Sequence, residues 1–120
     1  MNTMTNCKES DWKLFRVKIV EWQERYMDKV NKKLLKLLSD EKLPPSEKFW
    51  KAEKLIIREK KSAGVIVEMS RSMFKINLIK LLNEKAITME DLVDFSPELQ
   101  EEIKKVKEGL NQTPKCRRLI

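Results

Sequence analysis

Residues 65–82 constrain the fold most strongly, because apolar side chains cover most of the circumference of the helix that this stretch predicts. At about 100° per residue, these side chains fall on two nearly opposite sides: Val65, Ile66, Met69, Met73 and Ile76 on one, and Val67, Phe74, Leu78 and Leu81 on the other. A helix with two apolar sides needs neighbours on both. A strand is the alternative for residues 65–67, but the chain has no second β-branched run with which it could pair. The sequence therefore predicts a central helix that other helices surround.

The composition favours long helices around this centre. The chain has 120 residues, of which only 2 are glycine and 4 are proline, so turn signals are few. We predict an all-α fold, a helical bundle of three main helices followed by a short helix and a fourth helix. In chain order, the main helices span 10–39, 47–62 and 64–83, the short helix runs from Thr88 to about Val93, and the fourth helix spans 97–109.

This bundle would form a single domain. A chain of this length suits one domain with a modest core, and we assign residues 10–110 to it. Residues 1–9 are polar and predict a disordered N-terminal segment. Residues 111–120 predict a basic C-terminal tail.

Local signals set several helix boundaries. Thr88, with Asp91 three residues later, is typical of a capping box. Ser96 before Pro97 predicts the N-cap and the first position of the last helix. Gly64 is predicted to be the residue that follows a helix C-terminus.

The apolar side chains of residues 47–62 fall into two groups. Phe49, Ala52 and Ile56 predict the core face of this helix, and Trp50 and Ile57 lie about a quarter-turn away. The second group, together with the two apolar sides of the central helix, can exceed what one small chain covers. Self-association is therefore left open.

Five short segments carry a resemblance to known proteins. They are Asp11-Trp12-Lys13-Leu14-Phe15-Arg16, Trp22-Gln23-Glu24-Arg25-Tyr26-Met27, Lys48-Phe49-Trp50, Glu68-Met69-Ser70-Arg71-Ser72-Met73 and Ile87-Thr88-Met89-Glu90-Asp91-Leu92. In order and spacing they resemble a group of small, uncharacterised helical bacterial proteins, over residues 11–103. The resemblance implies a bacterial cytosolic protein and supplies no activity. Members of the group are sometimes labelled multidrug transporters, a label that we reject here because no segment is apolar and long enough to span a bilayer.

Residue types that carry most enzyme chemistry are scarce. The chain has no histidine, so the usual proton shuttle at neutral pH is missing. Cys7 and Cys116 lie in opposite terminal segments and make no zinc site without histidine; two cysteines beside a helical core favour a reducing compartment. The only glycines, Gly64 and Gly109, form no phosphate-binding loop. We predict no catalytic residues, no metal and no cofactor.

One candidate site is a polar stripe on the first half of the central helix. Glu68, Arg71 and Lys75 follow i, i+3, i+7 spacing there, and we regard them as a candidate buried polar stripe. Because a guanidinium can bind a carboxylate or a phosphate through two parallel hydrogen bonds, Arg71 is a candidate anion-binding residue. The alternative, which we favour, is that Arg71 bonds to Glu68 or to a carboxylate of a neighbouring helix and stabilises the packing.

A second candidate site is the basic stripe of Lys51, Lys54, Arg58 and Lys61, with Trp50 beside it. Aligned cations next to an aromatic ring suit an anionic partner, above all a phosphate backbone with one stacked base. The alternative, again favoured, is a solvated helix face whose lysine stems cover the edges of the core.

These observations leave two binding functions and one catalytic function to weigh. The leading hypothesis is a small, non-catalytic cytoplasmic interaction or accessory protein whose partner is another protein or a second copy of itself. The alternative hypothesis is a nucleic-acid-associated protein that uses the basic stripe, since a net charge of +7 attracts anions. An enzyme is the third hypothesis. Membrane insertion is not expected.

Overall fold

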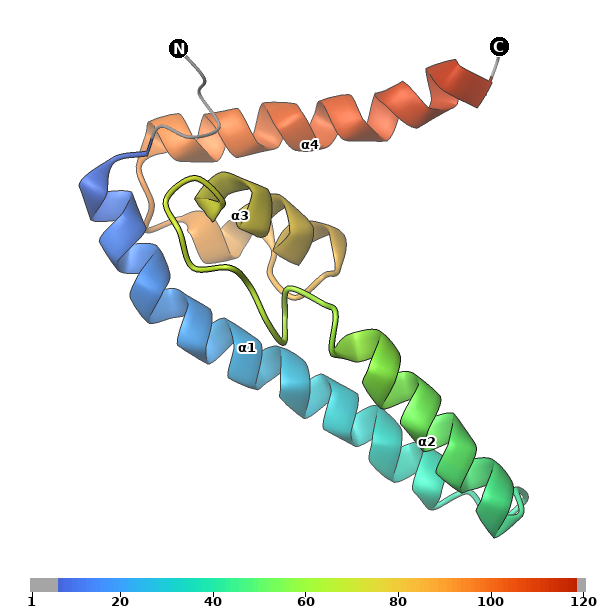
Figure 1. Cartoon of the computed structure of the whole chain (residues 1–120). Coiled ribbons are helices and arrows are strands. Elements are labelled where there is room, and N and C mark those ends of the chain that lie inside the picture. Colours follow the sequence, from blue (N-terminus) through green and yellow to red (C-terminus); the bar gives the residue numbers. More distant parts are fainter. Residues whose placement is uncertain (1–6, 119–120) are drawn as a thin grey trace.

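Four α-helices and one short 3-10 helix follow one another along the chain, with no strand between residues 7 and 118. The computed structural model describes the backbone of these residues and the side chains of residues 7–109. The elements are α1 (Glu9–Leu38), α2 (Pro45–Glu59), α3 (Phe74–Asn83), η1 (Met89–Leu92) and α4 (Pro97–Arg118). In Figure 1, α3 lies between the first half of α1 and α4, and α2 runs back along the second half of α1. The predicted all-α class is confirmed.

The two ends of the chain differ from the predicted boundaries. α4 does not end near Gly109 but continues to Arg118, so residues 111–118 of the predicted tail are helical. A single glycine inside a helix costs only about 1 kcal/mol, which is too little to end this one. The predicted disordered segment, residues 1–9, lies mostly outside the described residues, and its last residue begins α1.

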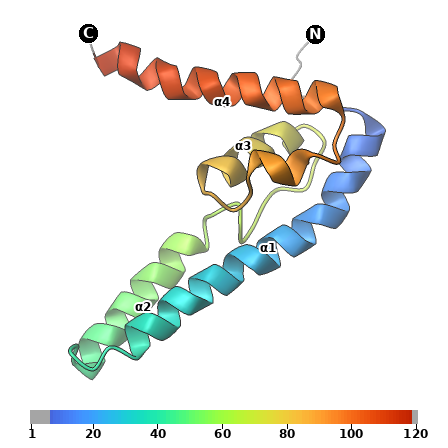
Figure 2. The same ribbon diagram turned by 180° about the vertical axis from the view of Figure 1, so that it is seen from behind.

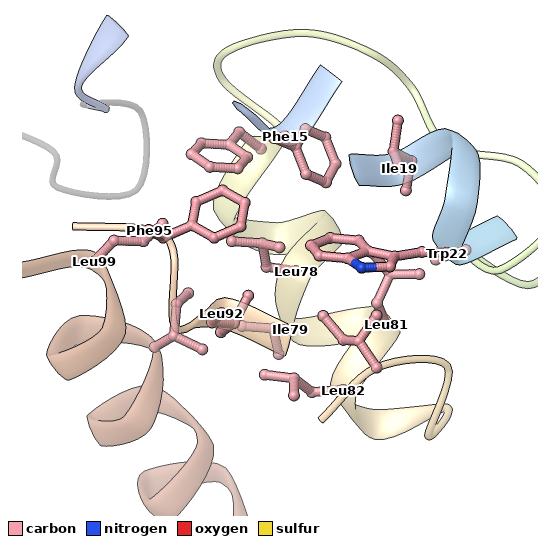
Figure 3. Packing of buried hydrophobic residues seen from close by; sticks show 14 of the residues in the cluster. Phe15, Ile19, Trp22, Leu78, Ile79, Leu81, Leu82, Leu92, Phe95 and Leu99 are labelled. Atoms are coloured by element: carbon pink, nitrogen blue, oxygen red, sulfur yellow. The ribbon is translucent and has the colours of Figure 1, made fainter. Parts of the chain in front are cut away.

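The hydrophobic core is assembled around α3. Phe74, Leu78 and Leu81 of this helix are fully buried, and the ring centroid of Phe74 lies 4.8 Å from that of Phe15 on α1. The side chains that surround α3 in Figure 3 come from α1, from η1 and the residues after it, and from the start of α4: Phe15, Ile19, Trp22, Leu92, Phe95 and Leu99. Among the described residues, α2 contributes nothing to this cluster. The prediction that residues 47–62 present a face to the core is therefore wrong for this cluster, because the start of α4 takes the place of α2.

Hydrogen bonds join the start of α1 to the start of α4. Ser96 is the N-cap of α4, as predicted, and its hydroxyl accepts a hydrogen bond from the backbone N–H of Leu99 at 3.3 Å. Asp11 is buried inside α1, and its carboxylate accepts hydrogen bonds from the N–H of Ser96 at 2.9 Å and from its hydroxyl at 2.6 Å. The predicted capping box of Thr88 and Asp91 is also present, at η1. These contacts fix the route of the chain between α3 and α4.

The predicted central helix is wrong in its first half. Residues 64–73 are not helical, and α3 begins only at Phe74. Val65 and Val67 are half-buried, whereas Ile66 is 64 % exposed and Glu68 is also exposed. Alternation of this kind is common in an extended chain, but here the chain turns at Val65, because the N–H groups of Val65 and Ile66 both donate to the Ser62 carbonyl, at 3.0 and 2.9 Å. Residues 66–69 form neither helix nor strand, so neither the predicted helix nor the strand alternative describes residues 65–67.

Side chains from distant elements hold this irregular segment in place. The Glu84 carboxylate accepts hydrogen bonds from the N–H groups of Ala63 at 2.9 Å and Gly64 at 3.1 Å. The Gln23 amide donates to the Ala63 carbonyl at 3.0 Å, and the Asn77 amide donates to the Glu68 carbonyl at 2.9 Å. Backbone groups that a helix would have paired internally are thus satisfied by side chains, which makes the non-helical path stable.

Gly64 is needed because the chain packs closely at this junction. It does not end a helix, and its φ is not positive. Among the described residues no glycine has positive φ, and α2 ends at the C-cap residue Lys60. A Cβ atom at Gly64 would overlap the ring of Tyr26 on α1. The glycine is required because the backbone of the segment touches that ring directly.

The substitution Gly64→Ala should lower the free energy of unfolding by about 1–3 kcal/mol, because the added methyl group forces Tyr26 and the backbone apart. Urea denaturation followed by circular dichroism measures the loss. Gly109→Ala is the matched control, since a Cβ there meets nothing within 4 Å and alanine favours a helix over glycine by about 1 kcal/mol. A Gly64→Ala protein as stable as the wild type would contradict this close contact.

Candidate functional site

The candidate site lies on the α1–α2 hairpin, which the second half of α1 forms with α2. Figure 1 shows this hairpin extending away from α3 and α4, and Figure 2 shows the same arrangement from behind. The Cα radius of gyration is 17.5 Å, against about 14 Å for a compact domain of this length. Between residues 24 and 60 only Val30 and Glu59 are buried. Each helix of the hairpin therefore covers only one face of the other.

The face of α2 that meets α1 differs from the predicted one. Lys48, Ala52 and Leu55 are half-buried and Glu59 is buried, at spacings of four, three and four residues. The predicted core face was Phe49, Ala52 and Ile56, but Phe49 is 63 % and Ile56 45 % exposed. The periodicity correctly showed which positions of α2 are apolar. It could not show that only one helix, α1, lies against α2, whereas two neighbouring helices would be needed to cover all of its apolar side chains.

The exposed side chains of the hairpin include a large apolar group. We define the apolar surface as Leu35, Leu38, Phe49, Trp50, Ile56 and Ile57. Its exposed area is on the order of 600 Å², at the upper end for the largest patch on a monomer. A cleft of about 410 Å³ opens in it between Leu38 of α1 and Phe49, Ile56 and Ile57 of α2. Such a surface is typical of a binding site for another macromolecule.

The basic stripe lies on a different side of α2. Lys51, Lys54 and Arg58 are exposed within the helix, whereas Lys61 is exposed just beyond its end. Trp50 is 55 % exposed, and its ring lies edge-on to that of Phe49 with centroids 4.9 Å apart. Trp50 therefore belongs to the apolar surface, and the stripe keeps three aligned cations on the helix.

A hydrogen-bonded carboxylate closes the base of the hairpin. The hydroxyl of Tyr26 donates to Glu59 Oε1 at 2.6 Å, and the hydroxyl of Ser62 donates to the same oxygen at 3.0 Å. The bond from Tyr26 holds the pKa of the Glu59 carboxyl below its ordinary value, with smaller contributions from Ser62, Arg58 and the Lys33 ammonium. Burial and the same carboxylate raise the pKa of the Tyr26 hydroxyl. Glu59 is thus ionised and tied to α1 at neutral pH.

The candidate stripe of Glu68, Arg71 and Lys75 does not exist as a buried stripe, because only Lys75 lies on a helix. Glu68 and Arg71 are exposed on the irregular segment. Arg71 donates two hydrogen bonds to Glu9 of α1, from Nε at 3.2 Å and from Nη2 at 2.7 Å. The buried Lys75 ammonium donates to both oxygens of Glu102 on α4, at 2.9 and 3.0 Å. Both cations connect elements of the fold.

A smaller polar cleft of about 250 Å³ adjoins this ion pair. It is lined by Cys7, Asp11, Lys75, Ser96, Glu98 and Glu102, together with Lys8 and Leu99. Partial burial raises the pKa of the Cys7 thiol, and the nearby Glu9 carboxylate raises it further. A raised pKa lowers the thiolate fraction at neutral pH, so Cys7 is not an activated nucleophile.

Sequence reasoning missed the contribution of α1 to the apolar surface. Leu35 and Leu38 lie outside the apolar seam that packs on α2, which uses Val30, Leu34 and Leu37. The available signal was an excess of leucines around the end of this helix, more than one neighbouring helix can cover. The pair Trp50 and Ile57, noted as displaced from the core face, was the corresponding signal on α2.

Comparisons with known proteins add no family to this description. The chain matches no protein-family model, no curated protein and no solved structure. The resemblance to the group of helical bacterial proteins stays a prediction. Within the described part of the chain, no helix combines the length and apolar character that crossing a membrane requires. In the same residues, no group of three or more Cys, Asp or Glu side chains is placed to hold a metal ion.

The substitution Tyr26→Phe should lower the free energy of unfolding by about 1–3 kcal/mol at neutral pH, because it removes the donor to a carboxylate and keeps the ring that packs on Gly64. Glu59 has a lowered pKa when folded, so its contribution is present above the ordinary value of 4.5 and is lost as the pH falls through the folded pKa.

The difference between wild type and Tyr26→Phe should therefore shrink between about pH 5 and pH 3. Urea denaturation across this range measures it. A difference that stays constant with pH would show that the Glu59 carboxylate is not the partner that matters.

Proposed function

We propose that this chain is a small, non-catalytic protein that works by binding another protein molecule through the apolar surface of the α1–α2 hairpin. The observation that carries the proposal is the exposure of six large apolar side chains on two helices with only two buried residues between positions 24 and 60. Leaving this surface in water is unfavourable by about 25 cal/mol per Å², so a partner that covers it gains affinity. The proposal places the protein in the bacterial cytoplasm, as the resemblance implies.

The kind of partner follows from the surface. Aromatic side chains that are half-exposed in a cleft are typical binding hot spots of protein–protein interfaces. Phe49 lines the cleft, Trp50 packs edge-on against Phe49, and the charged side chains of Glu53 and Lys60 also line the cleft. A protein partner can fill the apolar cleft and satisfy both charges.

The substitution Ile56→Glu should reduce the amount of partner recovered with the tagged full-length chain by about tenfold or more, because it places a charge at the centre of the contact. Recovery is measured from an extract in about 0.5 M salt, where long-range charge attraction is screened, with the recovered proteins identified by mass spectrometry. Lys51→Glu is the matched control on another side of α2 and should leave recovery unchanged. Equal recovery by wild type and Ile56→Glu would contradict the proposal.

A second candidate function, nucleic-acid binding, is favoured by the basic side of the hairpin. Arg58 forms an ion pair with Glu59, with Nη2 and Oε2 3.5 Å apart, and Lys33 of α1 also contributes to the lowered pKa of that carboxyl. Lys51 and Lys54 are exposed on the same helix as Arg58. Cations aligned on a rigid helix can follow a phosphate backbone.

For three phosphate contacts, affinity for DNA or RNA should fall about 40-fold between about 50 and 200 mM salt. Fluorescence anisotropy with a labelled oligonucleotide measures this slope, and charge reversal at both Lys54 and Arg58 should abolish binding. A flat salt response would exclude this candidate.

A further inference from the structure

The charges around the apolar cleft identify a more specific partner. Glu53 and Lys60 line the cleft on either side of Ile56 and Ile57. They are seven residues apart, two turns of helix, and Lys60 keeps helical φ and ψ as the C-cap of α2. Both are exposed, and neither makes an ion pair within residues 7–109. The cleft thus carries one acid and one base without an ion pair among the described residues, equally far along the sequence from the midpoint between Ile56 and Ile57.

This arrangement is self-complementary under a two-fold axis. When two α2 helices pack antiparallel with the axis between Ile56 and Ile57, each residue faces the one equally far from the axis on the other copy. Glu53 of each copy then faces Lys60 of the other, and the isoleucines meet at the centre. Any interface built on the basic stripe would instead place cations against cations, because Lys51, Lys54 and Arg58 carry no acid among them.

The size of the surface fits the same partner. An interface that covers the whole apolar surface on both copies would bury about 1,200 Å² in total, the lower limit for specific protein–protein contacts. Two hairpins placed face to face would give four helices with apolar side chains between them, the arrangement that stabilises four-helix bundles. An anionic bilayer fits less well, because Glu53 lies within the apolar side that would enter the headgroup region.

We propose that a second copy of this chain covers the apolar surface, in a two-fold symmetric dimer in which Glu53 of each protomer pairs with Lys60 of the other. This inference rests on the proposed function, since it names the partner of the same surface. Leu38 and Phe49, which line the same cleft, lie beside this contact, and the basic stripe stays outside it.

The test is a charge swap on the full-length chain, read by sedimentation equilibrium from about 1 to 500 µM at about 0.1 M salt. Wild type should show a concentration-dependent dimer. Glu53→Lys alone and Lys60→Glu alone should each raise the dissociation constant about tenfold or more, because each turns both symmetric pairs repulsive. The double variant Glu53→Lys/Lys60→Glu should return it to within about threefold of wild type. Thermal denaturation by circular dichroism checks that every variant is folded.

Lys51→Glu is the control, since it changes the net charge as Lys60→Glu does but lies away from the cleft, and it should leave the dissociation constant within about threefold of wild type. If the wild type stays monomeric over the whole concentration range, the inference is wrong. Binding to anionic vesicles by such a monomer would not rescue it. If the double variant does not regain the dissociation constant of the wild type, the pairing of Glu53 with Lys60 is wrong. Neither result overturns the proposed function, which fails only if Ile56→Glu captures the same proteins as wild type.

Discussion

The burial of α3 on nearly all sides is the constraint on which the rest of the structure depends. Of its ten residues, seven are buried, including Lys75 and Asn77. Such a helix must be enclosed, and the first half of α1, the segment around η1 and the start of α4 enclose it. The two buried polar residues are satisfied by Glu102 and by the backbone of Glu68, because unpaired polar groups in this core would cost several kcal/mol. Once these neighbours are committed to α3, the second half of α1 has only α2 to pack against.

The surfaces of the hairpin follow from this arrangement, in which the second half of α1 packs only on α2. A pair of helices buries one stripe from each partner and leaves the remaining faces in solvent. On α2 those faces are of two kinds, an apolar one that continues onto the end of α1 and a basic one. The base of the hairpin is fixed by Tyr26, Glu59 and Gly64, which tie α2 and the chain after it to α1. The two surfaces are therefore held in a set position relative to the core.

The sequence predicted those elements whose signals are local. α1 follows from the 3,4 spacing of Trp12, Phe15, Ile19 and Trp22, and η1 and α4 begin at the predicted caps. The exposure of the basic stripe followed from spacing as well. The irregular residues 64–73 could not be predicted, because they are held by Glu84, Gln23 and Asn77, which lie between 9 and 40 residues away in sequence. Likewise, helical periodicity shows that Phe49 and Ile56 are apolar but not whether a neighbour exists to cover them.

The two surfaces of the hairpin are compatible with one another, because they point in different directions from α2. In a dimer of the proposed kind, the apolar surface is buried, and the stripes of Lys51, Lys54 and Arg58 remain exposed on both copies. The net charge of +7 on each chain opposes association, but the charges that meet in the interface are of opposite sign and lie much closer than a Debye length of about 10 Å. Self-association would thus increase the number of cations carried by one particle. Any affinity of this protein for a polyanion would then rise with its own concentration, which links the two binding hypotheses through a single equilibrium.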